Sequence, residues 1–104
     1  MSVYNIIELI KKNKDCDSFH IFSEKYFRSH ISKITKDSEL KEYTMEDQNL
    51  LIILVKGDIE IIINDNVNIA HTNEMVLIKE HERFRMKTKT DCILNFIWSP
   101  GVNA

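Results

Sequence analysis

Glycine, proline and cysteine are all scarce in this chain of 104 residues, which has two glycines, one proline and two cysteines. Cys16 and Cys92 lie far apart with no CxxC motif, which predicts free thiols in a reducing compartment and argues against a disulfide scaffold. With so few glycines and prolines, asparagine, aspartate and serine must form most of the turns. A surplus of positive charge is also missing, because the formal net charge is −2. Binding to a nucleic acid is therefore not expected.

Long hydrophobic runs are absent too, and no stretch has the length needed to cross a bilayer. Residues 1–14 do not resemble a signal peptide, because they lack a basic leader and carry Glu8 inside their apolar run. We therefore expect a cytoplasmic protein without membrane contact. The composition, with 43% hydrophobic and 29% charged residues, predicts one globular domain over residues 1–104.

The first apolar residues repeat at helical spacing. Val3, Ile6, Ile7 and Ile10 would share one face, Ser2 could cap the start, and three lysines near the end suit the helix dipole. We predict one short amphipathic helix over about residues 3–13.

From residue 19 onward the apolar spacing shortens toward two, which is typical of β-strands. The clearest signals are the run at 50–55 and a hairpin made by 59–63 and 67–70 around a turn at 64–66. Short strand segments at such spacing predict an all-β fold, a small antiparallel β-barrel or jelly roll over about residues 19–98. The other segments expected in it are 19–21, 26–27, 30–35, 40–45, 75–78, 84–86 and 92–98. Residues 99–104 read as a frayed tail.

Two of these segments, LLIILV at 50–55 and CILNFIW at 92–98, are apolar on both faces. A barrel wall needs an apolar inner face only, so something must cover the outer one. The N-terminal helix can cover part of it, and a second subunit could cover the rest, which predicts a homodimer.

Residues 54–86 resemble the central part of a cupin domain. Gly57 stands where the family has the glycine that ends its first motif, residues 60–69 match its hairpin, and Asn73-Glu74 replaces its Gly-Asp corner. The resemblance implies a cupin jelly roll. The segment 91–97 is similar to a late strand in the sensor half of AraC-type transcription regulators, which implies ligand sensing, although no helix-turn-helix occurs in the sequence.

Metal-binding cupins hold their ion with the motif H-x-H-x(3,4)-E-x(6)-G and one further histidine. Counted back from Gly57, Thr44 and Glu46 stand at the two histidine positions and Leu50 stands at the glutamate position. In the longer spacing, Tyr43 and Met45 take the two histidine positions instead. Phe84 stands at the position of the further histidine. Glu46 alone keeps a ligand type, and one carboxylate does not hold a metal. The resemblance therefore implies neither metal nor other cofactor.

The remaining polar clusters give no strong functional signal. His71 and His81 fall in turns and are expected to be exposed, whereas His20 and His30 lie in strand segments and could reach the barrel interior. The alternating charges around Phe84 favour a solvated face, with Phe84 and Met86 pointing inward.

The predicted interior consists of Leu50, Ile52, Ile59, Ile61, Phe84, Met86 and either Trp98 or Asn95. These residues either fill the barrel as core or line an apolar cavity whose polar groups would be Tyr43, Glu46 and Trp98. The second alternative predicts a binding site for a small, partly apolar molecule. Its residues would be Tyr43, Glu46, Leu50, Ile52, Phe84, Met86 and Trp98.

Three functions remain open from the sequence. The first is a non-catalytic ligand-binding or sensing domain, such as the effector-binding half of an AraC-type regulator. The second is a small cupin enzyme, an isomerase or dioxygenase, with atypical metal ligands such as His30 and Glu46. The third is a barrel with a filled interior that serves only for dimerisation.

Overall fold

A computed structural model describes residues 2–100 of the chain. It has one helix, α1 (Ile6–Lys12), followed by β-strands only. The helix begins three residues later than predicted, because Asn5 and not Ser2 is the N-cap and its side chain accepts a hydrogen bond of 3.0 Å from the backbone N–H of Glu8. Between residues 2 and 100, no helix has the length and apolar character needed to span a membrane.

The chain then forms nine strands in this part of the sequence. They are β1 (Ser18–Ser23), β2 (Arg28–Ile34), β3 (Glu39–Thr44), β4 (Gln48–Lys56), β5 (Ile59–Ile63), β6 (Asn66–Ala70), β7 (Met75–Ile78), β8 (Arg83–Thr88) and β9 (Cys92–Pro100). The expected strand at Tyr26 and Phe27 is wrong, because both residues lie in the exposed β1–β2 connection. Ser99 and Pro100, predicted as tail, extend β9, and residues 101–104 lie outside the described residues.

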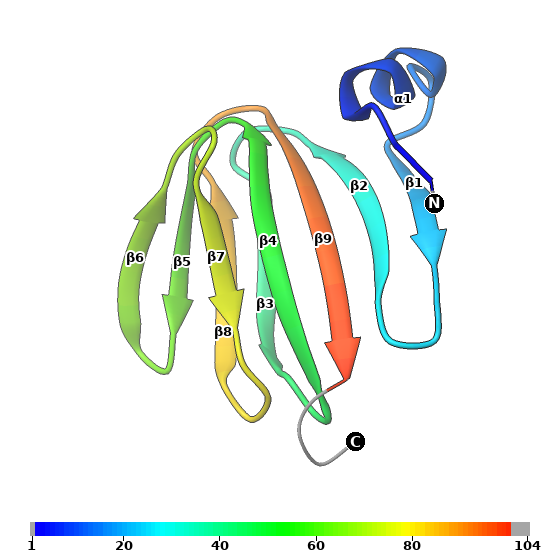
Figure 1. Cartoon of the computed structure of the whole chain (residues 1–104). Helices are drawn as coiled ribbons and strands as arrows, with labels where there is room; N and C mark the ends of the chain where they lie inside the picture. Colours follow the sequence, from blue (N-terminus) through cyan, green and yellow to red (C-terminus); the bar gives the residue numbers. More distant parts are fainter. Residues whose placement is uncertain (1, 101–104) are drawn as a thin grey trace.

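The strands form two antiparallel sheets that face each other (Figure 1). One sheet has the order β1-β2-β9-β4-β7 and the other the order β3-β8-β5-β6. The predicted hairpin is β5–β6, and its turn residues Asn64 and Asp65 have φ angles of 46° and 70°, which asparagine and aspartate tolerate better than most residues. This arrangement confirms the predicted all-β jelly roll.

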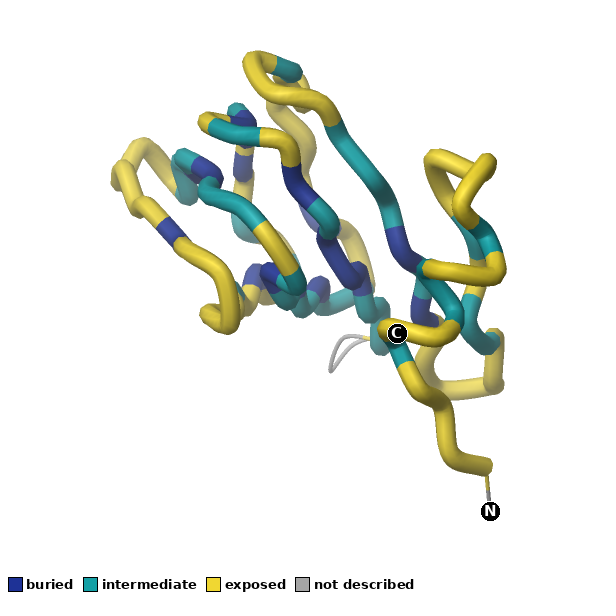
Figure 2. The backbone as a smooth tube through the Cα atoms, turned by 90° about the horizontal axis from the view of Figure 1, so that it is seen from above, coloured by how far each residue is buried: buried dark blue, intermediate teal, exposed yellow. Residues whose placement is uncertain are grey.

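The hydrophobic core is built from alternate residues of facing strands. In β4 and β9 the cross-strand pairs Leu50–Trp98, Ile52–Phe96 and Leu54–Leu94 point inward, opposite the buried Ile59 and Ile61 of β5. Figure 2 shows the buried residues gathered in these inner strands, while the loops and the N-terminal segment are exposed. For six interior positions the sequence predicts a single residue, and all six residues are buried: Leu50, Ile52, Ile59, Ile61, Phe84 and Met86.

Trp98 rather than Asn95 faces the interior. Asn95 lies on the outer face of the five-stranded sheet, where its side-chain oxygen accepts a hydrogen bond of 2.7 Å from the Ser29 hydroxyl, and both residues are buried. The segment before β1 lies against this end of the sheet. The rings of Tyr4 and Phe22 are 5.6 Å apart, and the Lys33 ammonium donates a hydrogen bond to the carbonyl of Asn13.

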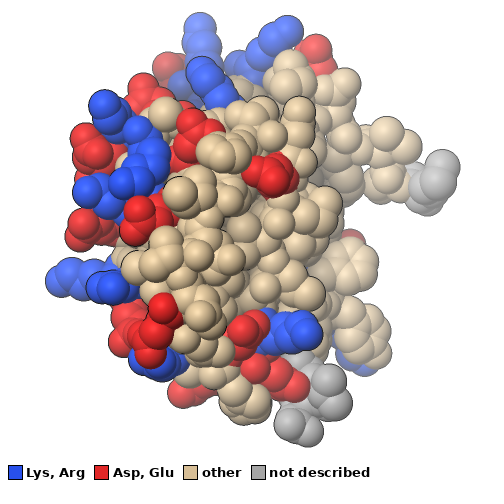
Figure 3. All heavy atoms as spheres, turned by 90° about the vertical axis from the view of Figure 1, so that its left-hand side faces the viewer, with Lys and Arg blue, Asp and Glu red and all other residues tan. Residues whose placement is uncertain are grey.

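The two outer faces differ in chemistry. On the four-stranded sheet, Arg83 is paired with Glu42 and Asp65, and Lys89 with Glu60. Figure 3 shows many charged side chains along one side of the molecule and a tan region through the middle of the view, with a few acidic side chains in it, at the free edges formed by β6 and β7. The exposed apolar residues on these two strands are Val67, Ile69, Met75 and Leu77.

Helix α1 covers only part of the outer face of the five-stranded sheet. None of its residues is buried, and it lies beside β1, at the opposite edge of the sheet from β7 (Figure 1). Met75 and Leu77, which pair with Ile53 and Leu51 of β4, remain 62% and 52% exposed. The outward apolar residues Leu51, Ile53, Ile93 and Ile97 are half-buried, and the predicted second subunit over them stays a prediction.

Gly57 is the position where the fold demands glycine. Its φ is +103°, and a Cβ there would lie 2.6 Å from the Cys92 sulfur and 2.7 Å from the Asp91 carbonyl oxygen. We expect Gly57→Ala to lower the free energy of unfolding by about 1–3 kcal/mol or more in urea denaturation, because strain and overlap add. The neighbouring exposed Lys56→Ala should change it by less than about 0.5 kcal/mol. Equal stability of both variants would contradict this account.

Candidate functional site

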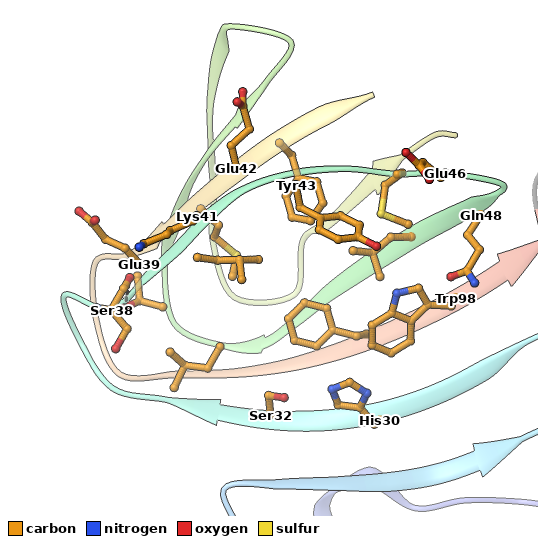
Figure 4. A pocket seen from close by; sticks show the side chains of 18 of the residues that line it. His30, Ser32, Ser38, Glu39, Lys41, Glu42, Tyr43, Glu46, Gln48 and Trp98 are labelled. Atoms are coloured by element: carbon orange, nitrogen blue, oxygen red, sulfur yellow. Dashed lines mark hydrogen bonds between the residues drawn. The ribbon is translucent and has the colours of Figure 1, made fainter. Parts of the chain in front are cut away.

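A cavity of about 750 Å³ lies between the two sheets, in the half of the barrel formed by β2, β9, β3 and β8. This volume is within the range of small-molecule sites in proteins. Figure 4 shows side chains from both sheets pointing into it. The lining residues are Arg28, His30, Ser32, Ile34, Ser38, Glu39, Leu40, Lys41, Glu42, Tyr43, Met45, Glu46, Gln48, Leu50, Phe84, Met86, Thr88, Phe96 and Trp98.

The wall formed by the five-stranded sheet is aromatic. His30 pairs with Phe96 across β2 and β9, and its ring stacks on Trp98 with centroids 4.7 Å apart and planes inclined by 29°. Phe96 and Trp98 are themselves stacked at 5.8 Å, and the Arg28 guanidinium lies 5.2 Å from the Trp98 ring centroid. The three rings pack against one another on one side of the cavity, and we call them the aromatic wall (His30, Phe96 and Trp98).

The opposite wall comes from β3 and β8. Tyr43 pairs with Phe84, and their rings meet edge to face at 6.4 Å. Phe84 is buried, but every residue of β3 is exposed, and Tyr43 is 59% exposed. β3 is therefore a thin rim over the cavity, supported on one side by β8 only.

Buried residues close the bottom of the cavity. Met45, Leu50 and Met86 are each at most 5% exposed and give it an apolar floor. At one end, the buried Thr88 hydroxyl donates a hydrogen bond of 2.7 Å to the Thr35 carbonyl and accepts one of 2.9 Å from the backbone N–H of Ser38. Thr88 thereby ties the β2–β3 connection to β8 and fixes where the rim begins.

Several polar groups turn into the cavity without a protein partner. The Trp98 indole N–H, the Tyr43 hydroxyl, the Gln48 amide and the Glu46 carboxylate form no side-chain hydrogen bond to any of residues 2–100. Figure 4 shows these four groups at the same end of the cavity. They supply donors and acceptors that are available to a bound molecule.

His30 is held in its neutral form. Burial against the aromatic wall lowers its pKa below the ordinary value of 6.5, and the nearby charges of His20 and Arg28 act in the same direction. At neutral pH the stacked imidazole therefore adds a flat polar ring to the cavity and no charge.

The structure brings together six of the seven residues predicted as a ligand site: Tyr43, Glu46, Leu50, Phe84, Met86 and Trp98 line the cavity. Ile52 does not. It is fully buried beside Leu54 in the filled half of the core, one inward position further from the rim than Leu50. The geometry places the six residues at one cavity, and their role in binding stays a prediction.

On β2, sequence reasoning identified His30 as a residue that could reach the interior and missed Arg28 and Ser32. All three line the cavity, whereas Ile31 points to the outer face and is fully buried there. Polar residues inside and a buried isoleucine outside reverse the usual rule, so only the alternation along R-S-H-I-S-K-I could have indicated it. The aromatic signal at Phe96 was also available, since it lies two residues before Trp98 and shares its face.

The histidines do not form a cluster with other ligand types. His71 and His81 are exposed as predicted, and His71 contacts Asp58 at 2.7 Å on the surface. Within residues 2–100, no group of three or more histidine, cysteine, aspartate or glutamate residues could hold a metal ion. Both cysteines are free, with Cys16 exposed and Cys92 buried.

Comparison with known proteins identifies the fold. The sequence matches no protein-family model and none of the curated proteins. The structure is similar to a cupin-2 domain containing protein from Shewanella frigidimarina, with 18% identity, a TM-score of 0.77 and coverage of 94% of each chain. The chain has the cupin fold.

Two further cupin-fold neighbours are of different kinds. One is the cupin domain of Schizosaccharomyces pombe Cnp3, with 12% identity and a TM-score of 0.77 over 83% of this chain and 65% of that one. The other is a predicted oxalate decarboxylase from Thermotoga maritima, with 12% identity and a TM-score of 0.72 over 80% and 78%. This chain thus spans about two thirds of the Cnp3 domain. At such identities the likeness extends to the fold alone, because one fold hosts many functions.

The lowered pKa of His30 predicts a pH dependence of stability. The unfolded chain takes up the proton first as the pH falls through about 6.5, so the free energy of unfolding should fall over about pH 7.5–5.5. His30→Gln should flatten this fall in urea denaturation. Both proteins should also carry His71→Gln, because the hydrogen bond that the His71 ring donates to Asp58 raises the pKa of His71 and acts in the opposite direction. Identical slopes with and without His30 would contradict the assignment.

Proposed function

We propose that this domain binds a small, partly apolar molecule in the cavity and catalyses no reaction. The observation that carries the proposal is the aromatic wall of His30, Phe96 and Trp98, which faces Tyr43 across a cavity with an apolar floor. A barrel with a filled interior would not leave half of its length open. Rigid aromatic side chains with a few unpartnered polar groups are typical of ligand sites.

Two substitutions relative to the metal-binding cupin pattern favour binding over catalysis. Leu50 and Phe84 stand at the positions of the family's glutamate and last histidine, and both line the cavity. They offer an apolar surface where a catalytic cupin would present ligand atoms. On this proposal, no cofactor is needed for binding.

The sensing role is the finer part of the proposal. We propose that the domain reports the bound state to a partner, as the effector-binding half of an AraC-type transcription regulator would. The support is the similarity of residues 91–97, most of β9, to the regulators' late strand. A cytoplasmic location belongs to this proposal, and the two unpaired cysteines are compatible with a reducing compartment.

One observation favours a second function, that of a small cupin enzyme. His30 and Glu46, an imidazole and a carboxylate, line the same cavity. They could serve as atypical metal ligands together with groups from a substrate. Elemental analysis of purified protein separates the two functions: a stoichiometric divalent metal that is lost in His30→Gln would favour the enzyme.

The proposed partner is a second copy of the chain. Met75 and Leu77 of β7 continue onto the half-buried Leu51 and Ile53 of β4, and these four residues form an apolar patch on the outer face of the five-stranded sheet. Val67 and Ile69 of β6 pair with Ile62 and Glu60 and lie on the outer face of the other sheet. A surface without charge is compatible with itself, and a two-fold dimer places the same patch on both subunits. At ~25 cal/mol per Å² of apolar surface, hiding these side chains contributes several kcal/mol.

Sedimentation velocity tests the dimer. The wild type should be dimeric at micromolar concentration, and Met75→Lys with Leu77→Lys should shift it to monomer, because two ammonium groups would be buried in the interface. Lys87→Glu with Arg85→Glu, on the charged outer face of β8, serves as the matched control and should leave the dimer intact. A wild-type monomer at micromolar concentration would rule out this partner.

A thermal-shift screen tests ligand binding. Sugars, aromatic acids, heteroaromatic compounds and short-chain lipids should include at least one class that raises the melting temperature. A hundredfold excess over the dissociation constant adds about 2.7 kcal/mol of stability, a shift of several degrees for a domain of this size. Trp98→Ala should abolish the shift, whereas Tyr26→Ala, an exposed aromatic outside the cavity, should preserve it. If no compound stabilises the wild type, the domain is not a sensor.

A further inference from the structure

The two walls of the cavity select a flat guest. On one side the His30 and Trp98 rings stack with centroids 4.7 Å apart, and Phe96 packs against both of them. On the other side stands the Tyr43 ring, held at its edge by Phe84 (Figure 4). A planar ring between the two walls would gain stacking contacts on both of its faces, beyond the area that it buries.

The lining carries more carboxylates than cations. Arg28 and Lys41 are the cations, and Glu39, Glu42 and Glu46 are the anions, of which Glu42 shares Arg83 with Asp65. Neutral His30 adds no further charge. A lining with a small excess of negative charge does not attract an acid, so an uncharged guest suits it better than a carboxylate does.

Polar groups gather at the two ends of the cavity, and a few also lie between the ends. Figure 4 places Ser38, Glu39 and Lys41 at one end and Glu46 and Gln48 at the other. Between them lie the aromatic wall and the apolar floor, together with the polar Ser32 and Glu42. A sugar would bury hydroxyls against the rings and the floor, where no partner is available, and each buried unpartnered hydroxyl is costly. An alkyl chain would leave the Trp98 N–H and the Gln48 amide unpartnered.

The geometry points to an uncharged, planar heteroaromatic ligand of about two fused rings, whose edge exchanges hydrogen bonds with Gln48, Glu46, the Tyr43 hydroxyl and the Trp98 N–H. This inference rests on the proposed function and names the class of its ligand. Such a molecule carries both donors and acceptors on its rim, which matches the mixed donors and acceptors at that end of the cavity. Its flat faces match the aromatic wall and Tyr43.

Isothermal titration calorimetry with four probes tests the ligand class. Quinoxalin-2-one is the neutral, flat probe. Quinoline-2-carboxylate is a flat probe of similar size that carries a negative charge. Glucose is a neutral probe that is not flat and carries many hydroxyls, and octanoate is a flexible alkyl chain with a carboxylate. Quinoxalin-2-one should bind at least about tenfold more tightly than each of the others, because only it is flat, neutral and hydrogen-bonding at its edge.

Two variants locate the binding. Trp98→Leu and Tyr43→Leu should each weaken quinoxalin-2-one by about threefold to tenfold, the range expected for loss of one stacking face. Tyr43 is exposed, so its variant tests the site without disturbing the core. Tyr26→Leu, outside the cavity, should bind as the wild type does.

The outcomes separate this inference from the proposed function. Octanoate or glucose binding as tightly as quinoxalin-2-one, with loss in Trp98→Leu, overturns the ligand class and leaves a binding cavity. Binding of quinoxalin-2-one that neither cavity variant weakens overturns the assigned location. Failure of all four probes, together with a thermal-shift screen that finds no stabilising compound, overturns both the ligand class and the proposed function.

Discussion

The pairing of β4 with β9 is the constraint on which the rest of the structure depends. It joins two central strands of the five-stranded sheet in register from Gln48–Pro100 to Leu54–Leu94. Because side chains alternate, this register decides at once which residues face the opposite sheet. Leu54 and Leu94 lie in the filled half of the core. Leu50 and Trp98, which are two inward-facing positions further along their strands, line the cavity. A slip by one residue would exchange the inner and outer faces.

The cavity persists because β3 is not packed like its neighbours. The β5 and β6 end of the four-stranded sheet meets the opposite sheet through fully buried isoleucines, Ile59 and Ile61. β3 offers Leu40 and Tyr43 instead, which are 43% and 59% exposed, and β2 opposes them with arginine, histidine and serine. Neither strand brings enough aliphatic volume to fill the space. The barrel is thus tightly packed in one half and hollow in the other.

The sequence was sufficient for the fold, because hydrophobic alternation, the Asn-Asp turn and Gly57 are local signals that the tertiary structure obeys. It placed Leu50, Phe84, Met86 and Trp98 at the cavity because β4, β8 and β9 follow the usual rule of apolar side chains inside, and it reached Tyr43 and Glu46 through the spacing of the family motif. On β2 it named only His30, because the polar Arg28 and Ser32 lie inside while Ile31 is buried on the outer face. Ile52 was misplaced for another reason: periodicity gives the face of a strand but not the depth at which a core ends and a cavity begins.

β4 carries residues of both surfaces to which we assign function, and β9 is paired with it. On β9, Trp98 forms the cavity wall and its neighbour Ile97 faces outward, and on β4 Leu50 and Leu51 divide in the same way. A ligand that restrains Trp98 therefore acts on a backbone that also positions the outer face. Such coupling shifts association only if the ligand binds the associated form more tightly than the free form, and association then tightens ligand binding by the same factor. The reciprocity makes the sensing role measurable from either surface, because a dimer-breaking change at β7 must alter affinity at Trp98 if the two are linked.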